Sequence, residues 1–148
     1  MKQHFISLVL FFSFLLSGCM PLKQTEVTSP NGHIRLAFAL DGNNRMTYQV
    51  SVGDTVFIAP SLLGFTAKDG VNLAEGFKVI NTDFTTYDET WTQPWGENKT
   101  IRNHYNEMAV HLSDTTNTQL TLRFRIFDDG LGFRYEYEVP GVDSILVT

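Results

Sequence analysis

The chain has 148 residues and one cysteine, Cys19, so no disulfide can form within it. A fold without disulfides depends on packing or on a bound metal, and twelve Phe, five Tyr and two Trp favour aromatic packing. The net charge of −5 and the pI near 5.2 exclude the clustered basic surface of nucleic-acid-binding proteins, and they are compatible with a neutral partner such as a sugar.

The N-terminus has the pattern of an export signal. Lys2 precedes the apolar run 5–16, which is too short to span a bilayer of about 30 Å. The residues Leu16-Ser17-Gly18-Cys19 resemble the bacterial lipobox, after which the signal is removed and the new N-terminal cysteine carries acyl chains. We therefore expect a lipoprotein signal peptide over 1–19, lipidation at Cys19, and export to the cell envelope, in the periplasm or at the outer membrane. The alternatives are an ordinary signal peptide with an incidental cysteine and a buried apolar segment, and the basic start disfavours the second.

Beyond the predicted anchor, the pattern changes from an irregular segment to strands. Residues 20–30 contain two prolines and no sustained periodicity, so we expect a tether over 20–28. From His33 onward apolar and polar residues alternate with a period of two, which is typical of strands that bury one face. The predicted strands cover residues 34–40, 46–52, 55–58, 77–80, 108–112, 120–126 and 133–137. No stretch predicts an amphipathic helix, so the sequence predicts an all-β fold, an antiparallel β-sandwich or a barrel.

One segment, residues 86–107, does not fit this alternation and contains both tryptophans. Pro94 and Gly96 at its centre favour an irregular loop, and loops on a rigid scaffold commonly display binding groups. Tryptophan rings stack on the apolar faces of pyranose rings, while amide, carboxylate and imidazole groups pair with sugar hydroxyls. The candidate carbohydrate-binding residues are Trp91, Trp95, Glu97, Asn103, His104, Asn106 and Glu107. The alternative is a structural crossover whose tryptophans fill the end of the sandwich.

The spacing of the titratable residues predicts no metal site. His104 lacks partner ligands, because His33 and His111 fall in separate predicted strands. The residues Asp128-Asp129-Gly130 have neither the length nor the terminal glutamate of a calcium loop, so they predict a turn. The Arg and Glu side chains of the last predicted hairpin alternate with its apolar residues, which predicts cross-strand ion pairs on a solvated face.

Three long motifs resemble a known family. They are Asp88-Glu89-Thr90-Trp91-Thr92-Gln93-Pro94-Trp95-Gly96-Glu97, Ile101-Arg102-Asn103-His104-Tyr105-Asn106-Glu107 and Phe127-Asp128-Asp129-Gly130-Leu131-Gly132-Phe133-Arg134-Tyr135-Glu136. With residues 29–32 and 63–65, they resemble the N-terminal domain of glycoside hydrolase family 97 over nearly all of residues 27–148. The resemblance implies a β-supersandwich of the galactose-mutarotase type over residues 29–148, incomplete at its C-terminal end.

Enzymes of this family hydrolyse α-glucosidic or α-galactosidic linkages with a calcium ion near the sugar, and a (β/α)₈ barrel supplies their catalytic residues. The resemblance therefore implies the N-terminal domain of an exported α-glycosidase without its barrel, in which no catalytic or metal-binding residue is assigned and which is not expected to be catalytic alone. It implies three partners: an oligosaccharide or glycan, the barrel, and a membrane through the lipid anchor. Two alternatives remain, a free-standing glycan-binding lipoprotein and a non-functional truncated remnant.

Overall fold

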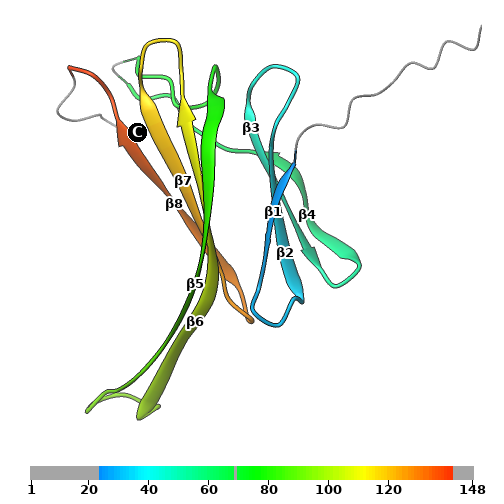
Figure 1. Cartoon of the computed structure of the whole chain (residues 1–148), viewed down its shortest axis with the longest axis vertical. Coiled ribbons are helices and arrows are strands. Elements are labelled where there is room, and N and C mark those ends of the chain that lie inside the picture. Colours follow the sequence, from blue (N-terminus) through cyan, green and yellow to red (C-terminus); the bar gives the residue numbers. More distant parts are fainter. Residues whose placement is uncertain (1–23, 69, 142–148) are drawn as a thin grey trace, which may run out of the picture.

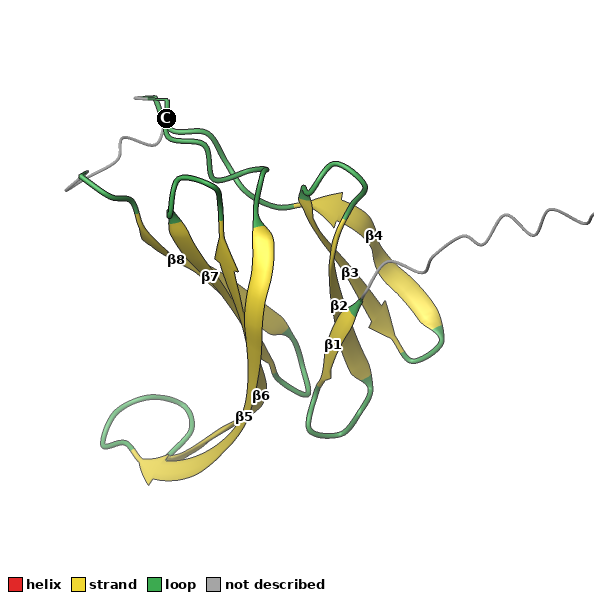
Figure 2. Cartoon of the chain, turned by 45° about the horizontal axis from the view of Figure 1, so that its top comes forward, coloured by secondary structure: helices red, strands yellow, loops and turns green. Residues whose placement is uncertain are grey.

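The computed structural model describes residues 24–68 and 70–141, which form two facing sheets of four strands each (Figures 1 and 2). The strands are β1 (Thr25–Thr28), β2 (Ile34–Leu40), β3 (Met46–Val52), β4 (Thr55–Leu62), β5 (Lys78–Thr92), β6 (Thr100–Ser113), β7 (Gln119–Ile126) and β8 (Leu131–Glu138). The sheet orders are β1-β2-β3-β4 and β5-β6-β7-β8, and all neighbouring strands are antiparallel. The predicted antiparallel β-sandwich is confirmed. The described residues include no helix long and apolar enough to cross a membrane.

The core lies between the two sheets and follows from the alternation in β2 and β7. In β7 the even-numbered residues from Leu120 to Ile126 are buried, whereas the odd-numbered residues are exposed or half-buried. In β2, Phe38 points into the same core, and its ring lies 6.1 Å from that of Phe124. Burying each such side chain contributes about 1.5–3 kcal/mol. Apolar contact between β2 and β7 therefore holds the two sheets together.

The predicted tether over residues 20–28 is wrong for its last four residues, which form β1. This strand pairs with β2, with Val27 opposite Leu36, and Val27 is buried. Four residues are too few to display a period of two, so the sequence pattern did not reveal the strand. Residues 1–23, which include the predicted signal peptide and Cys19, lie outside the described residues.

The prediction of an irregular loop over residues 86–107 is also wrong. Strands β5 and β6 pair without a break from Thr82 opposite Val110 to Thr92 opposite Thr100, and only residues 93–99 form a turn. The outer half of this hairpin is exposed along β5, and of residues 100–106 in β6 only Tyr105 is buried, so polar residues occupy positions of both parities. Period-two alternation reports a contrast in burial, and that contrast is weak here.

Side-chain hydrogen bonds fix the position of one sheet against the other. The hydroxyl of Tyr135 in β8 accepts the backbone N–H of Gly64, at 2.8 Å, in the segment that follows β4. The Asn106 side chain in β6 donates to the Thr28 carbonyl oxygen in β1, at 2.9 Å. Gly64 has a φ of 101°, and a Cβ there would lie 2.4 Å from the carbonyl oxygen of Leu73. This close approach requires glycine.

We expect Tyr135→Phe to lower the free energy of unfolding by about 1–2 kcal/mol, because the partly buried N–H of Gly64 loses its acceptor. Tyr137→Phe is the matched control, since Tyr137 lies on the same strand and is exposed. Its effect is expected to stay within about 0.5 kcal/mol. Urea denaturation followed by circular dichroism measures both. Equal effects of the two substitutions would contradict the role of the Tyr135 hydroxyl.

Candidate functional site

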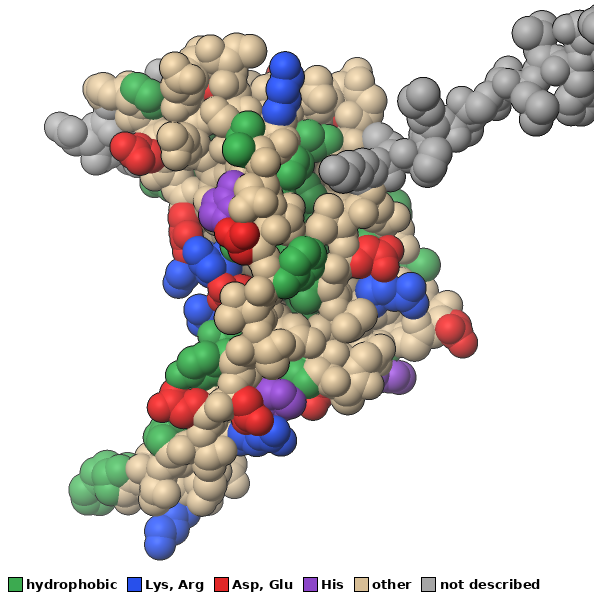
Figure 3. Space-filling model, in the orientation of Figure 1, with side chains coloured by type: hydrophobic (Ala, Val, Ile, Leu, Met, Phe, Trp, Pro, Cys, Tyr) green, Lys and Arg blue, Asp and Glu red, His purple; other side chains and the backbone are tan. Residues whose placement is uncertain are grey.

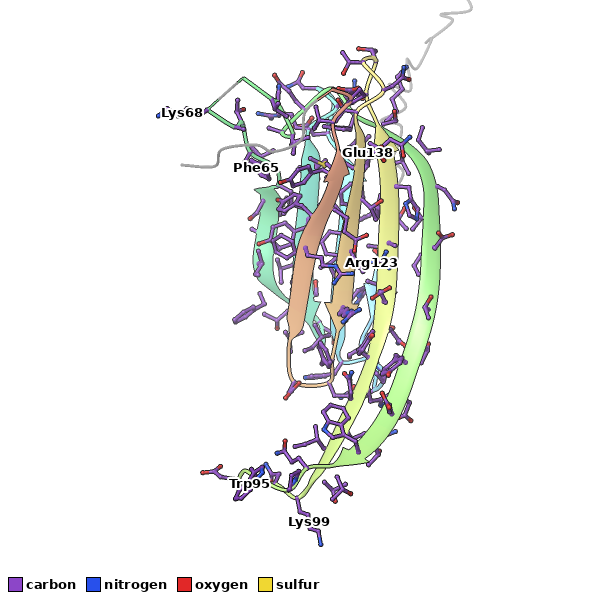
Figure 4. All side chains as sticks on the ribbon, turned by 90° about the vertical axis from the view of Figure 1, so that its left-hand side faces the viewer. Phe65, Lys68, Trp95, Lys99, Arg123 and Glu138 are labelled. Atoms are coloured by element: carbon purple, nitrogen blue, oxygen red, sulfur yellow. The ribbon has the colours of Figure 1, made fainter. Side chains whose placement is uncertain are left out.

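The β5–β6 hairpin extends beyond the rest of its sheet as a two-stranded arm. Strand β7 pairs with β6 only from Asn106 to Ser113, so residues 87–105 have no third strand beside them. We call residues 87–105 the arm. Each of its strands extends about 20 Å past the end of the pairing with β7, and Figure 4 shows Trp95 and Lys99 at its far end. The predicted carbohydrate-binding residues all lie in the arm or in the next two positions of β6.

The strand register divides these candidates between two faces. We call the side of the β5–β8 sheet that points away from β1–β4 the outer face. Trp91, opposite Ile101, and Asn103, opposite Glu89, lie on the outer face. His104 lies opposite Asp88, and its side chain points to the other face. The structure therefore brings Trp91 and Asn103 to one side of the arm and places His104 on the opposite side.

The turn at the end of the arm is ordered by backbone and side-chain contacts. The Gln93 backbone N–H donates to the Lys99 carbonyl oxygen, and the Gln93 side chain donates to the Asn98 carbonyl oxygen, both at 3.0 Å. Gly96 has a φ of 116°, and a Cβ there would lie 2.8 Å from the side-chain amide nitrogen of Gln93. Trp95 is 85% exposed in this turn, and Glu97 is also exposed. The tip of the arm therefore presents a large aromatic ring to solvent.

Two of the candidates are already engaged in structural contacts. Asn106 donates to Thr28 and accepts the Thr86 hydroxyl, at 2.8 Å, so it ties β1 to the β5–β6 hairpin. Glu107 accepts from Arg123 at 2.6 Å and from Arg125 at 2.7 Å, and its side chain is only 11% exposed. These partners occupy the groups with which Asn106 and Glu107 would otherwise hold a sugar.

Glu107 belongs to a row of ion pairs across the outer face, in which Arg123, labelled in Figure 4, is the central cation. Figure 3 shows basic and acidic side chains gathered along this edge of the molecule. The row consists of Glu107, Arg123, Arg125, Arg134 and Glu136. The hydrogen bonds from Arg123, assisted by Arg134, lower the pKa of Glu136 to about 2. Burial raises the pKa of Glu107, but the bonds from Arg125 and Arg123 outweigh it and lower that pKa. The predicted cross-strand ion pairs are confirmed.

An aromatic stack lies beside this row, and the sequence pattern did not predict it. The rings of Tyr87 and Tyr105 stack at 5.2 Å, and the Arg125 guanidinium lies 4.7 Å from the centre of the Tyr105 ring. The Tyr87 hydroxyl also donates to Glu89. Tyr87, Glu89 and Trp91 are spaced two residues apart, so they share the outer face once β5 is known to continue to Thr92. Their spacing is the signal that would have found them.

Several acidic residues of the described ranges accept hydrogen bonds from groups within the chain. Within 24–68 and 70–141 there is no group of three or more His, Cys, Asp or Glu placed to hold a metal ion. The carboxylate of Asp128 instead accepts the backbone N–H of Asn31, at 2.8 Å. The carboxyl groups with a clear shift have lowered pKa values, because arginines or hydroxyl and backbone groups donate to them: Asp41, Asp88, Glu107, Asp114 and Glu136. Such groups remain ionised at neutral pH and act as hydrogen-bond acceptors.

Comparison with known proteins agrees with the fold and with the motifs on the arm. The family model described as Glycosyl-hydrolase 97 N-terminal matches residues 27–148. A retaining alpha-galactosidase of Bacteroides thetaiotaomicron is 26% identical over 113 residues, which are 76% of this chain and 16% of that enzyme. A glycoside hydrolase family 97 enzyme from a Pseudoalteromonas species, solved in complex with panose and with acarbose, is 30% identical. Its TM-score is 0.76 over 82% of this chain and 19% of the enzyme.

A beta-arabinopyranosidase is 22% identical, with a TM-score of 0.71 over 79% of this chain and 18% of the arabinopyranosidase chain. This similarity supports the fold alone. The sandwich and the matched region define the class of the protein, an N-terminal β-sandwich domain of a glycoside hydrolase. The chain belongs to glycoside hydrolase family 97. It spans less than one fifth of the length of the relatives that it matches.

The ion-pair row gives the fold a dependence on pH. Because the folded pKa of Glu136 lies below its ordinary value of 4.5, its ion pairs stabilise the fold fully above about pH 4.5 and are lost as the pH falls toward 2. We expect the free energy of unfolding to fall across this range, with a smaller fall in Glu136→Gln. Glu138→Gln is the control, since Glu138 lies on the same strand and face and makes no ion pair within the described residues. Urea denaturation between pH 2 and 6 measures the free energy of unfolding of each variant. The same dependence on pH in Glu136→Gln and in Glu138→Gln would contradict the prediction.

Proposed function

We propose that this chain is the N-terminal β-sandwich of an exported glycoside hydrolase family 97 α-glycosidase that acts on α-glucosides or α-galactosides. The observation that carries this proposal is the family match over residues 27–148 in a chain that spans less than one fifth of its relatives. One relative is named as an alpha-galactosidase, and another was solved with panose and acarbose. Cleavage of the glycosidic bond is assigned to a (β/α)₈ barrel elsewhere in the whole polypeptide, and calcium to a site there.

The proposed location is the cell envelope, with a lipid anchor at Cys19. The basic start, the apolar run 5–16 and the residues before Cys19 support it. In this proposal residues 1–19 are the signal peptide with its lipobox, the cut falls before Cys19, and the sandwich follows further along the chain. An anchored enzyme would keep its products near the cell that imports them.

Within the whole enzyme, the described residues act as a rigid support. Glu107 and Glu136 on the outer face are paired with arginines and stay ionised, so they are poor donors of a proton to a leaving group. The same pairs hold the side chains of β6, β7 and β8 in fixed positions. This arrangement suits a surface that positions another domain.

The whole polypeptide tests the function directly. We expect the DNA after the codon for Thr148 to encode a barrel in the same or a shifted frame, and the joined product to hydrolyse p-nitrophenyl α-glucoside or α-galactoside. The activity is expected in the membrane fraction, and Cys19→Ser is expected to move it to the soluble fraction. A clean stop codon with no barrel nearby, or a joined product inactive on both substrates, would contradict the proposal.

A free-standing glycan-binding lipoprotein is the second candidate function. The exposure of Trp95, and the presence of Trp91 beside Asn103 and Glu89 on the outer face of the arm, favour it. Aromatic rings with polar neighbours can stack on a pyranose and pair with its hydroxyls. In this function His104, on the opposite face, and Glu97, at the tip, would form hydrogen bonds with sugar hydroxyls.

This second function predicts binding by the chain alone. Because both tryptophans lie in the arm, a saturable change in fluorescence with maltose, panose or melibiose would report sugar at that place. The chain is used as Cys19→Ser without its signal peptide, with and without calcium, and Trp91→Ala and Trp95→Ala identify the ring involved. Phe57→Ala, at an exposed aromatic residue of β4, is the control. No change in the fluorescence of a folded chain would exclude this function. If the joined product were also inactive, the remaining alternative would be a non-functional truncated remnant.

A further inference from the structure

The side of the β1–β4 sheet that points away from β5–β8 carries a hollow over strands β1, β2 and β3 (Figures 1 and 2). Its volume is about 290 Å³, close to the lower limit of about 300 Å³ for small-molecule sites. We call it the polar hollow, and the residues that line it include Glu26, Arg35, Ala37, Gln49, Ser51 and Asp54. It belongs to the other sheet from the arm and the ion-pair row.

The strand register places a small apolar floor between longer polar side chains. Ala37 in β2 lies directly opposite Glu26 in β1 and opposite Gln49 in β3. Because neighbouring strands are about 4.8 Å apart, the Cα atoms of Glu26 and Gln49 are separated by about 10 Å, with only a methyl group between their side chains. Two residues earlier in β2, Arg35 lies opposite Ser51. Groups that form hydrogen bonds therefore surround the methyl group of Ala37.

A tight turn brings a carboxylate and an imidazole to the edge of the hollow. Gly53 and Asp54 connect β3 to β4, and the Gly53 N–H donates to the His33 carbonyl oxygen, at 2.8 Å. The ring of His33 lies beside this turn, with its Cε1 atom 3.6 Å from the place that a Cβ on Gly53 would take. Both Asp54 and His33 are exposed. The bond between the turn and β2 thus fixes where these two side chains begin.

The polar side chains of the hollow are not used by the fold. All six arginines of the chain lie within the described residues, and Arg35 alone forms no ion pair there. It is unpaired although Glu26 and Asp54 line the same hollow. No side-chain hydrogen bond joins Gln49 or Ser51 to another described residue. The ion-pair row differs, because its arginines and glutamates bind one another.

This mixture of groups fits a neutral ligand that carries many hydroxyls. A sugar hydroxyl can accept from the guanidinium of Arg35 and donate to the carboxylate of Glu26 or Asp54, and the amide of Gln49 can take either part. Two carboxylates and one guanidinium give the hollow a net negative charge, which disfavours a phosphate or a sulfated polymer. The methyl group of Ala37 offers a small apolar surface to the C–H face of a pyranose.

We propose that the polar hollow is an accessory binding site for a neutral glycan, whose hydroxyls are held by Glu26, Arg35 and Gln49. The choice of α-linked glucose or galactose as its sugar rests on the proposed function. The site holds the glycan without cleaving it, so in the whole enzyme it would keep a polymer close to the catalytic barrel. It is separate from the arm, where Asn106 and Glu107 are already bound by other residues.

A glycan fits this hollow better than a protein does. Protein interfaces centre on large aromatic or aliphatic anchors and on the pockets that receive them. Among the described residues, Ala37 supplies the only apolar side chain that lines the hollow. Such a surface offers a protein little apolar area to bury, whereas a sugar can use its polar groups one by one.

Affinity electrophoresis tests the site. The joined product is run in native gels that contain amylopectin or galactomannan, and if the DNA ends at Thr148 the chain itself is used as Cys19→Ser without its signal peptide. We expect the polysaccharide to slow the protein. A variant with both Arg35→Ala and Gln49→Ala is expected to bind about tenfold more weakly, because two hydrogen-bonding groups of the site are removed. Neither side chain has a partner in the fold, and circular dichroism checks that the variant is folded.

The matched control removes the same kinds of group from the other sheet. Lys78→Ala with Gln119→Ala deletes one cation and one amide at exposed positions of β5 and β7. Neither residue forms an ion pair or a side-chain hydrogen bond within the part of the chain that the structure describes. This control variant is expected to be slowed as much as the unsubstituted protein.

Four results would overturn the polar hollow as a glycan site. They are no slowing by either polysaccharide, equal slowing of the unsubstituted protein and the Arg35→Ala, Gln49→Ala variant, an equal loss in the control variant, and stronger slowing by dextran sulfate than by amylopectin. The α-glycosidase activity of the unsubstituted polypeptide tests the proposed function separately. An active enzyme with any of the four results overturns the hollow alone. An inactive product whose slowing depends on Arg35 and Gln49 overturns the proposed function alone.

Discussion

The whole structure depends on apolar contact between the inner faces of two sheets, because the single cysteine leaves no disulfide to hold them. Phe38 and Phe124 meet across the sheets, and the even-numbered residues of β7 continue that contact along the strand. Each residue that points into the core makes its neighbours in the sequence point outward. Arg123 and Arg125 lie on the outer face for this reason, next to the glutamates of β6 and β8. The polar chemistry of the outer face is thus a consequence of the core.

The arm continues the same alternation where no second sheet covers it. Between residues 100 and 105, strand β6 has no β7 beside it, and most side chains of the arm are exposed, although Tyr105 is buried. Local contacts such as the Asp88–Arg102 pair replace the core there, and an exposed ion pair contributes only about 0.2–1 kcal/mol. The arm is therefore the element with the least support from the sandwich. It also carries Tyr87, Trp91 and Trp95 among the exposed large hydrophobic residues.

The arginine-paired glutamates of the outer face are held in their ionised form. Glycoside hydrolysis requires a carboxylic acid whose pKa is raised enough to hold a proton near neutrality. Arg123 and Arg125 have the opposite effect on Glu107, and Arg123 and Arg134 have it on Glu136. These glutamates are locked as acceptors, so their chemistry fits positioning of side chains and strands.

Local sequence determined the strands that have one buried and one exposed face, since in β2 and β7 the period of two directly records burial. It also determined the ion pairs of the last hairpin, and its motifs indicated the family. The sequence could not reveal β1, whose four residues are a strand because β2 offers an edge to pair with. Nor could it show that the segment around Trp91 and Trp95 is a paired arm, since most side chains there are exposed and leave no clear alternation. The division of the candidate residues between two faces followed from the register of β5 and β6. Register depends on contacts between residues distant in the chain, so only the tertiary structure decided which residues share a surface.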